Sequence, residues 1–227
     1  MSADATFWEQ VALHGDLSRW TIDDVARAEL AAWEEAKGLQ LPEDFRDAAL
    51  DHGGSGFGGA VVVVARQGLL RSGLSVRVEG ILDPLARGHA LESVDRQHDH
   101  VREHLEFVFS EHGNDLRPQG AWYLPIAWNT RKELFCLDYT FSDVAPPVVF
   151  FDRNDDWGGN ADSFSGLRFV SRSFTDFTEL IEFPDTEIAF AEGNVETEPL
   201  LEWNRHRDVL FGFSEGVRHE FGGTGHL

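Results

Sequence analysis

The sequence predicts a fold that combines helices with consecutive antiparallel β-strands. The stretch 121–152 holds three short runs rich in aromatic and aliphatic residues, separated by polar residues or prolines. Such runs are typical of strands that follow one another in an antiparallel sheet. Before them come a segment of helical composition, LPEDFRDAAL at 41–50, and a glycine-rich corner, HGGSGFGG at 52–59. No catalytic motif lies on this frame, which favours a binding scaffold.

Length and composition allow one large domain with a sizeable core. The chain has 227 residues, 42% of them hydrophobic, with 18 Phe and 7 Trp. No apolar run approaches the roughly 20 residues that span a bilayer. The N-terminus lacks the basic and apolar regions of a secretory signal. Cys136 is the only cysteine, so no disulfide forms within the chain. We therefore expect a cytoplasmic location and no membrane partner.

A net charge of -21 is the strongest compositional signal. Such a chain is repelled by nucleic acid, so we expect no direct nucleic-acid partner. It associates quickly with a basic protein, because complementary fields steer the encounter. The same charge is equally typical of an acidic proteome that is poor in lysine. Of the 19 basic residues here, only Lys37 and Lys132 are lysines. The sequence leaves both explanations open.

The first part of the chain predicts an arm and two helices. Residues 1–20 are interpreted as a short helix or packed arm. Thr21 is expected to cap the next helix, with Asp24 completing a capping box, and Gly38 to end it. Pro42 then begins a further helix. The residues expected on the buried face of the first of these two helices are Ile22, Val25, Ala26, Leu30 and Trp33.

The rest of the chain predicts strands between two helical segments. The expected strands are 60–65, 74–82, 121–128, 133–140, 146–152 and 167–171. A helix is expected at 91–110, with His98 on its apolar stripe, and another follows Ser173 as its cap. We therefore divide the chain into an N-terminal arm at 1–20, an α+β domain at 21–184 and an acidic extension at 185–227. Within the extension, 198–213 is expected to be helical.

Two motifs match cofactor or metal sites but stand in the wrong context. The glycines of 54–59 satisfy G-x-G-x-x-G, yet a dinucleotide site needs that motif between a strand and a helix, and here the order is reversed. Residues 152–156 begin like a calcium loop, but Trp157 replaces its glycine and Ser163 its final glutamate. This leaves at most a weak cation site in that loop. We expect no cofactor and no resident metal.

The candidate catalytic residues also favour structural roles. His100, Glu103 and His104 match the H-x-x-E-H pattern of inverted zinc peptidases. Both histidines lie off the apolar stripe, which favours a solvated face that binds metal ions adventitiously. Cys136 lies in the middle of an apolar strand, where cysteines are inert packing groups. We expect the protein not to be an enzyme, with a metal-dependent hydrolase as the remote alternative.

The ordered set of segments resembles the SUKH superfamily, the Smi/Knr-like domains. The pattern L-P-x-D-[FY] stands at 41–45, L-P-I-A at 124–127, L-D at 137–138, P-V with an aromatic and an Asp at 147–152, and S-F-x-x-F at 173–177. The resemblance covers residues 21–183. It implies an α+β fold with a twisted antiparallel β-sheet and N-terminal and flanking helices. It also implies, for bacterial members, immunity proteins that bind and block secreted toxins, often nucleases.

Charge and resemblance together lead to one functional expectation. We expect a cytoplasmic immunity protein that neutralises a cognate polymorphic or contact-dependent protein toxin, itself basic, by occluding its active site. The alternative is a regulatory scaffold with an endogenous protein partner. The candidate contact residues lie on the acidic loop after 151 and on the neighbouring hairpin: Asp143, Asp152, Asp155, Asp156, Trp157 and Asp162.

Overall fold

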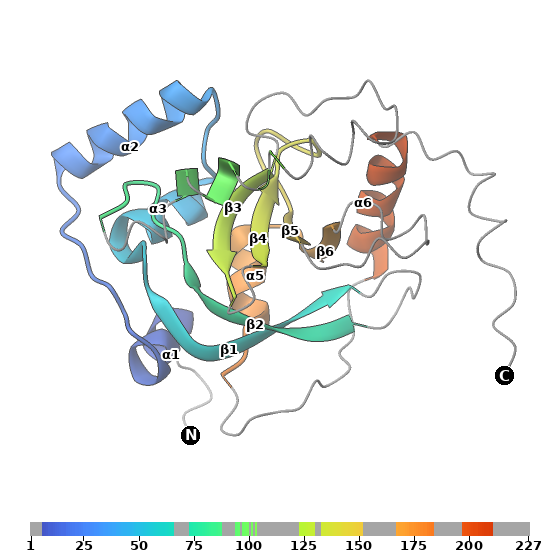
Figure 1. The fold of residues 1–227 in the computed structure, drawn as a ribbon, viewed down its shortest axis with the longest axis horizontal. Helices are drawn as coiled ribbons and strands as arrows, with labels where there is room; N and C mark the ends of the chain where they lie inside the picture. Colours follow the sequence, from blue (N-terminus) through green and yellow to red (C-terminus); the bar gives the residue numbers. More distant parts are fainter. Residues whose placement is uncertain are drawn as a thin grey trace, which may run out of the picture.

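The computed structural model describes residues 6–65, 73–87, 94–95, 97–99, 101, 103, 123–129, 133–151, 167–183 and 197–210. Within them the chain adopts the predicted α+β fold, a six-stranded antiparallel sheet with helices packed on it (Figure 1). The strands are β1 Gly56–Ala65, β2 Gly73–Ile81, β3 Tyr123–Trp128, β4 Leu134–Asp138, β5 Val148–Phe151 and β6 Leu167–Ser171.

The strands follow chain order across the sheet, from β1 at one edge to β6 at the other. Only two residue pairs, Gly80 with Trp128 and Ile81 with Ala127, join β2 to β3. The β1–β2 ribbon therefore swings away from the other four strands, and in Figure 1 it runs across the direction of β3 and β4. The short junction gives the sheet its strong twist.

The central strands are buried on both faces, which explains their continuous apolar sequences. In β4, Phe135 and Leu137 belong to the core on one face, whereas Leu134 and Cys136 belong to the core on the other. The neighbouring strand β5 alternates in the same way. Because successive side chains of a strand point to opposite faces, an apolar run of this kind needs cover on both sides.

The first face is covered mainly by α3 Glu43–His52 and α5 Phe174–Leu180, with α1 Phe7–His14 against β1 and α2 Asp24–Lys37 beside α3. Phe45 of α3 packs edge-on against Phe174 of α5, with ring centroids 5.1 Å apart. The ring centroid of Phe177, one turn along α5, lies 5.2 Å from that of Phe135 in β4. The two helices and the sheet thus form one continuous aromatic core. Among the described helices, none is long and apolar enough to cross a membrane.

The prediction for the start of α2 was wrong by two residues. Asp23, not Thr21, is the N-cap, and its Oδ1 accepts a hydrogen bond of 2.8 Å from the amide of Ala26. A charged acceptor binds an amide more strongly than a hydroxyl does, so the aspartate sets the helix start. In the resulting phase Val25 is 63% exposed rather than buried, while Ala26 and Leu30 face the core.

The glycine-rich corner is part of the sheet, contrary to the expected strand start at residue 60. β1 begins at Gly56 and carries an irregularity before Ala60. Gly58 has φ of +65°, and a Cβ there would lie 1.9 Å from the carbonyl oxygen of His14, at the end of α1. Glycine alone permits both the positive φ and this close approach of two backbones.

The second face is covered by α6 Thr197–Leu210, which lies in the predicted acidic extension. Trp203 is 2% exposed, and its indole Nε1 donates a hydrogen bond of 2.8 Å to Asp138 Oδ2 at the end of β4. His206 lies one turn further along α6, 3.1 Å from Thr140 Oγ1. This part of the extension therefore packs on the sheet, while the predicted boundary near residue 184 stays a prediction.

The carboxylate of Asp138 is buried beneath α6. Besides Trp203, it accepts hydrogen bonds from the amide and the hydroxyl of Thr140. Burial raises the pKa of Asp138, because a charged carboxylate loses its hydration there, and the bonds from Thr140 and Trp203 and the nearby His206 oppose this only in part.

Most of the expected helix at 91–110 lies outside the described residues. His98, expected on the apolar stripe, is buried, and so are Val94 and Val101 at helical spacing from it.

Replacing Gly58 by alanine should cost far more stability than the same change at Gly38. Both glycines have nearly the same positive φ, +65° and +66°, but a Cβ at Gly38 meets nothing within 4 Å. We expect Gly38→Ala to cost about 1–2 kcal/mol and Gly58→Ala about 2–5 kcal/mol, because the second also forces α1 away from β1. Urea unfolding of both variants measures the difference, and equal losses would contradict the proposed clash.

The buried charge of Asp138 should make stability depend on pH in a defined direction. The folded-state pKa lies above the unfolded value of 3.8, so the folded state binds the proton more readily. Protonation of Asp138 therefore stabilises the folded state. This stabilisation is complete below pH 3.8 and is lost as the pH rises through the folded-state pKa. The unfolding free energy of the wild type, minus that of Asp138→Asn, should therefore increase as the pH falls. A constant or opposite difference would show that the carboxylate is not destabilised by burial.

Candidate functional site

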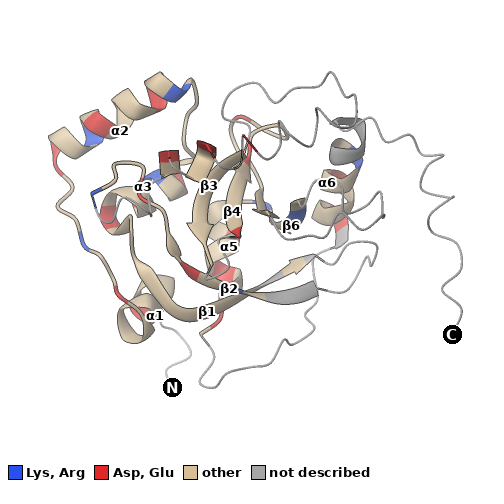
Figure 2. Cartoon of the chain, in the orientation of Figure 1, with Lys and Arg blue, Asp and Glu red and all other residues tan. Residues whose placement is uncertain are grey.

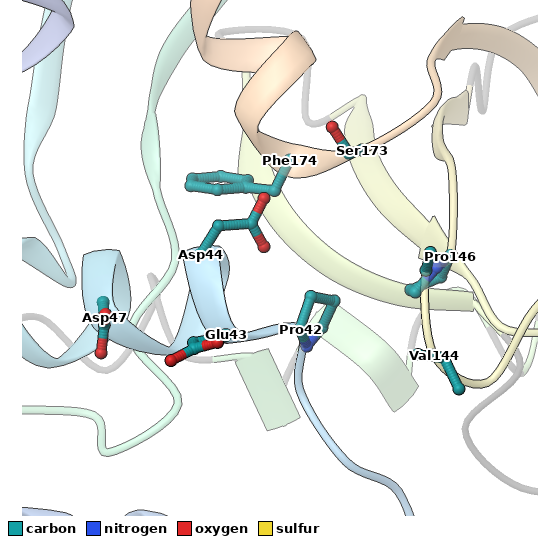
Figure 3. Close-up of a pocket in the computed structure, with 9 residues that line it drawn as sticks. Pro42, Glu43, Asp44, Asp47, Val144, Pro146, Ser173 and Phe174 are labelled. Atoms are coloured by element: carbon teal, nitrogen blue, oxygen red, sulfur yellow. The ribbon is translucent and has the colours of Figure 1, made fainter.

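A groove with a volume of about 450 Å³ opens where the start of α3, the turn between β4 and β5, and the start of α5 meet (Figure 3). Its apolar lining comes from Phe174, Val144, Ala145 and two prolines, Pro42 and Pro146. Phe174 is almost fully buried, while Val144 is 86% exposed on the turn. The remaining polar lining is Glu43, Asp44, Asp47 and Ser173. The groove therefore combines aliphatic and aromatic surface with carboxylates.

One of these carboxylates, that of Asp44, has a structural role. Asp44 extends from α3 toward the start of α5 (Figure 3). Its Oδ2 accepts hydrogen bonds from the amide and the hydroxyl of Thr175, at 2.8 and 2.7 Å. It thereby satisfies an amide in the first turn of α5, while Ser173 Oγ, as the N-cap, accepts from the amide of Asp176. Asp44 ties the two helices together and fixes the floor of the groove.

The other two acidic side chains, Glu43 and Asp47, have no partner among the described residues. Both are exposed, and they stand one turn apart on α3, on the side away from Phe174 (Figure 3). Figure 2 shows acidic residues on α1, α2 and α3. Several acidic residues outside this pair are bound to arginine, such as Asp83 to Arg87 and Asp176 to Arg172. Arg46, the basic residue of α3, binds Glu34 of α2 at 2.7 Å. The charges of Glu43 and Asp47 thus face solvent with no cation beside them among the residues that the structure describes.

The far wall of the groove is a turn held by its own hydrogen bonds. Ser142 Oγ accepts from the amides of Val144 and Ala145, at 3.3 and 3.0 Å. Tyr139 anchors the base of the turn, since its hydroxyl donates to the carbonyl oxygen of Gln40 at 2.9 Å. Burial raises the pKa of Tyr139, and the charges of Glu34 and Asp143 raise it further, so the hydroxyl stays protonated as a donor. The exposed Val144 is therefore held in place.

Of the predicted contact residues, the structure describes only Asp143. It is exposed on this turn, next to Val144 in the chain, but it is not one of the residues that line the groove. The other five, Asp152, Asp155, Asp156, Trp157 and Asp162, lie outside the described residues. Sequence reasoning did not single out Glu43, Asp47 or Val144. The acids beside the proline of LPED were a signal, but that motif was interpreted as a helix start and as part of the family pattern, not as a contact surface.

The residues tested for catalysis remain without a catalytic arrangement in the described part of the chain. Cys136 is fully buried, and burial together with the charge of Asp138 raises the pKa of its thiol well above the usual value, which makes it a poor nucleophile. Glu103 is exposed, while His100 and His104 lie outside the described residues. No cluster of three or more metal-binding side chains occurs among the residues described. Gly56 and Gly59 belong to a strand, not to the start of a helix.

Comparison with known proteins assigns the chain to a family. The family model of the SMI1 / KNR4 family (SUKH-1) matches residues 24–180, from the start of α2 to the end of α5. No curated protein and no solved structure matches the chain. The match spans the sheet, α3, α5 and all three walls of the groove, and it ends before α6. The chain belongs to the SMI1 / KNR4 family (SUKH-1).

Proposed function

We propose that the protein is a cytoplasmic immunity protein, which binds a cognate protein toxin and occludes its active site. The observation that carries this proposal is the groove, where the unpaired carboxylates of Glu43 and Asp47 stand beside exposed apolar surface. A toxin that acts on nucleic acid carries a cationic cleft, and an acidic protein surface competes for that cleft. Membership of the SUKH-1 family supports a role in protein binding.

The excess of acidic over basic residues supports a role in binding a basic protein. The chain has 40 acidic and 19 basic residues, so its field attracts a basic partner from a distance and accelerates association. The exposed apolar surface at the groove supplies what charge alone does not, because burying it strengthens a complex at short range. The alternative, a regulatory scaffold with an endogenous partner, uses the same surface but predicts a partner that is not a toxin.

Two measurements test this function with the full chain: the survival of cells that express the toxin, and the activity of the purified toxin in the presence of the protein. An immunity gene is expected to lie beside the gene of its toxin. The product of the neighbouring gene should therefore be toxic when expressed alone and harmless when expressed with the protein. The purified pair should form a stable complex in which the toxin is inactive. Affinity should fall at least about tenfold between about 50 mM and about 500 mM NaCl, since screening weakens charge complementarity.

The result that contradicts this function is a toxin that stays active when saturated with the protein. A complex whose affinity does not change with salt would contradict the electrostatic part. Capture of a host regulatory protein, with no protection against the toxin, would favour the scaffold.

A further inference from the structure

We propose that the groove between α3, the β4–β5 turn and α5 holds one exposed segment of the protein partner, in which an aliphatic side chain is flanked by arginine or lysine. This inference rests on the proposed function, because it names the part of the toxin that the groove receives. It differs from the sequence prediction, which placed the contact mainly on the loop after residue 151.

The apolar part of the groove requires the aliphatic side chain. Val144 is the most exposed large hydrophobic side chain among the described residues, and it lines the groove together with the almost fully buried Phe174. Leaving a valine in water on a turn forgoes the free energy of burying it. A partner side chain that enters the groove covers Val144, whereas Phe174 is already almost fully buried, and Pro42 and Pro146 add apolar surface that needs no hydrogen bonds.

The charged part of the groove requires the basic neighbours. Glu43 and Asp47 are four residues apart on one helix, so their carboxylates are neighbours and repel each other. Asp143 adds a third exposed negative charge beside Val144 on the opposite wall. A cationic side chain on each side of the aliphatic residue relieves this repulsion from both walls. Arginine suits the position especially well, because it forms two parallel hydrogen bonds with a carboxylate.

The groove keeps its shape without a partner, which limits the cost of binding. Asp44 ties α3 to α5 through Thr175, and Ser142 and Tyr139 hold the turn that carries Val144. None of these contacts uses Glu43 or Asp47. Because the walls are already ordered, the partner loses its own freedom on binding but the groove loses little.

Labelled pentapeptides test the inference without the toxin. The full chain is titrated at low salt with Gly-Arg-Leu-Arg-Gly, Gly-Arg-Gly-Arg-Gly and Gly-Glu-Leu-Glu-Gly, and binding is measured by fluorescence anisotropy. The first peptide should bind about threefold more tightly than the second, and the third should not bind. Amide chemical shifts of the ¹⁵N-labelled chain should change at 43–47, 143–145 and 173–175.

Matched variants separate the groove from the general charge. Glu43→Gln with Asp47→Asn should weaken binding of the Arg-Leu-Arg peptide about tenfold. Val144→Ser should remove its advantage over the Arg-Gly-Arg peptide. Glu29→Gln with Glu202→Gln removes the same charge from exposed positions on α2 and α6, and it should change affinity less than about twofold.

Equal effects of the two double variants, or shift changes spread over other surfaces, would overturn the groove as the site. So would toxin binding that is unaffected by Glu43→Gln with Asp47→Asn, although the immunity function itself would then stand. Peptide binding as described, with no toxin bound or inhibited, would count against the proposed function and leave the groove as a site for a basic segment of another protein.

Discussion

Burial of the central strands on both faces is the constraint on which the rest of the structure depends. Strands β4 and β5 place large apolar side chains on each side of the sheet, so neither face tolerates water. Helices α3 and α5 cover one face and α6 covers the other. The groove is a consequence of this arrangement, because it forms where the α3–α5 layer meets the turn that joins the two buried strands.

The acidic residues divide into those that hold the fold and those that are free to act. Asp44 accepts a hydrogen bond from the first turn of α5, and Asp138 accepts one from the indole of Trp203 in α6. Asp83 forms an ion pair of 3.1 Å with Arg87 beside the glycine-rich corner. Glu43 and Asp47 take part in none of these contacts. The net charge of -21 is therefore not spread evenly over the surface, because some of the acidic side chains are engaged in hydrogen bonds and ion pairs within the molecule.

The family match and the structure divide the chain at different places. The family model ends at residue 180, yet the second face of the sheet is covered by α6, which begins at Thr197. Trp203 closes this face and supplies a donor to Asp138, the aspartate of the L-D pattern in β4. The helix outside the family match thus completes the core in this chain, since a buried carboxylate and an apolar face both need a partner.

The sequence by itself determined the α+β class, the order of the described strands with the helices before and after them, and the family, because apolar periodicity and short motifs are local signals. It also identified Cys136 as buried and Ser173 as a helix cap. Only the tertiary structure decided which acids are free: Asp44 and Glu43 are adjacent in one motif, yet one binds Thr175 from 131 residues away and the other faces solvent. The same holds for Val144 and α6, whose roles depend on contacts between distant segments that no local pattern records.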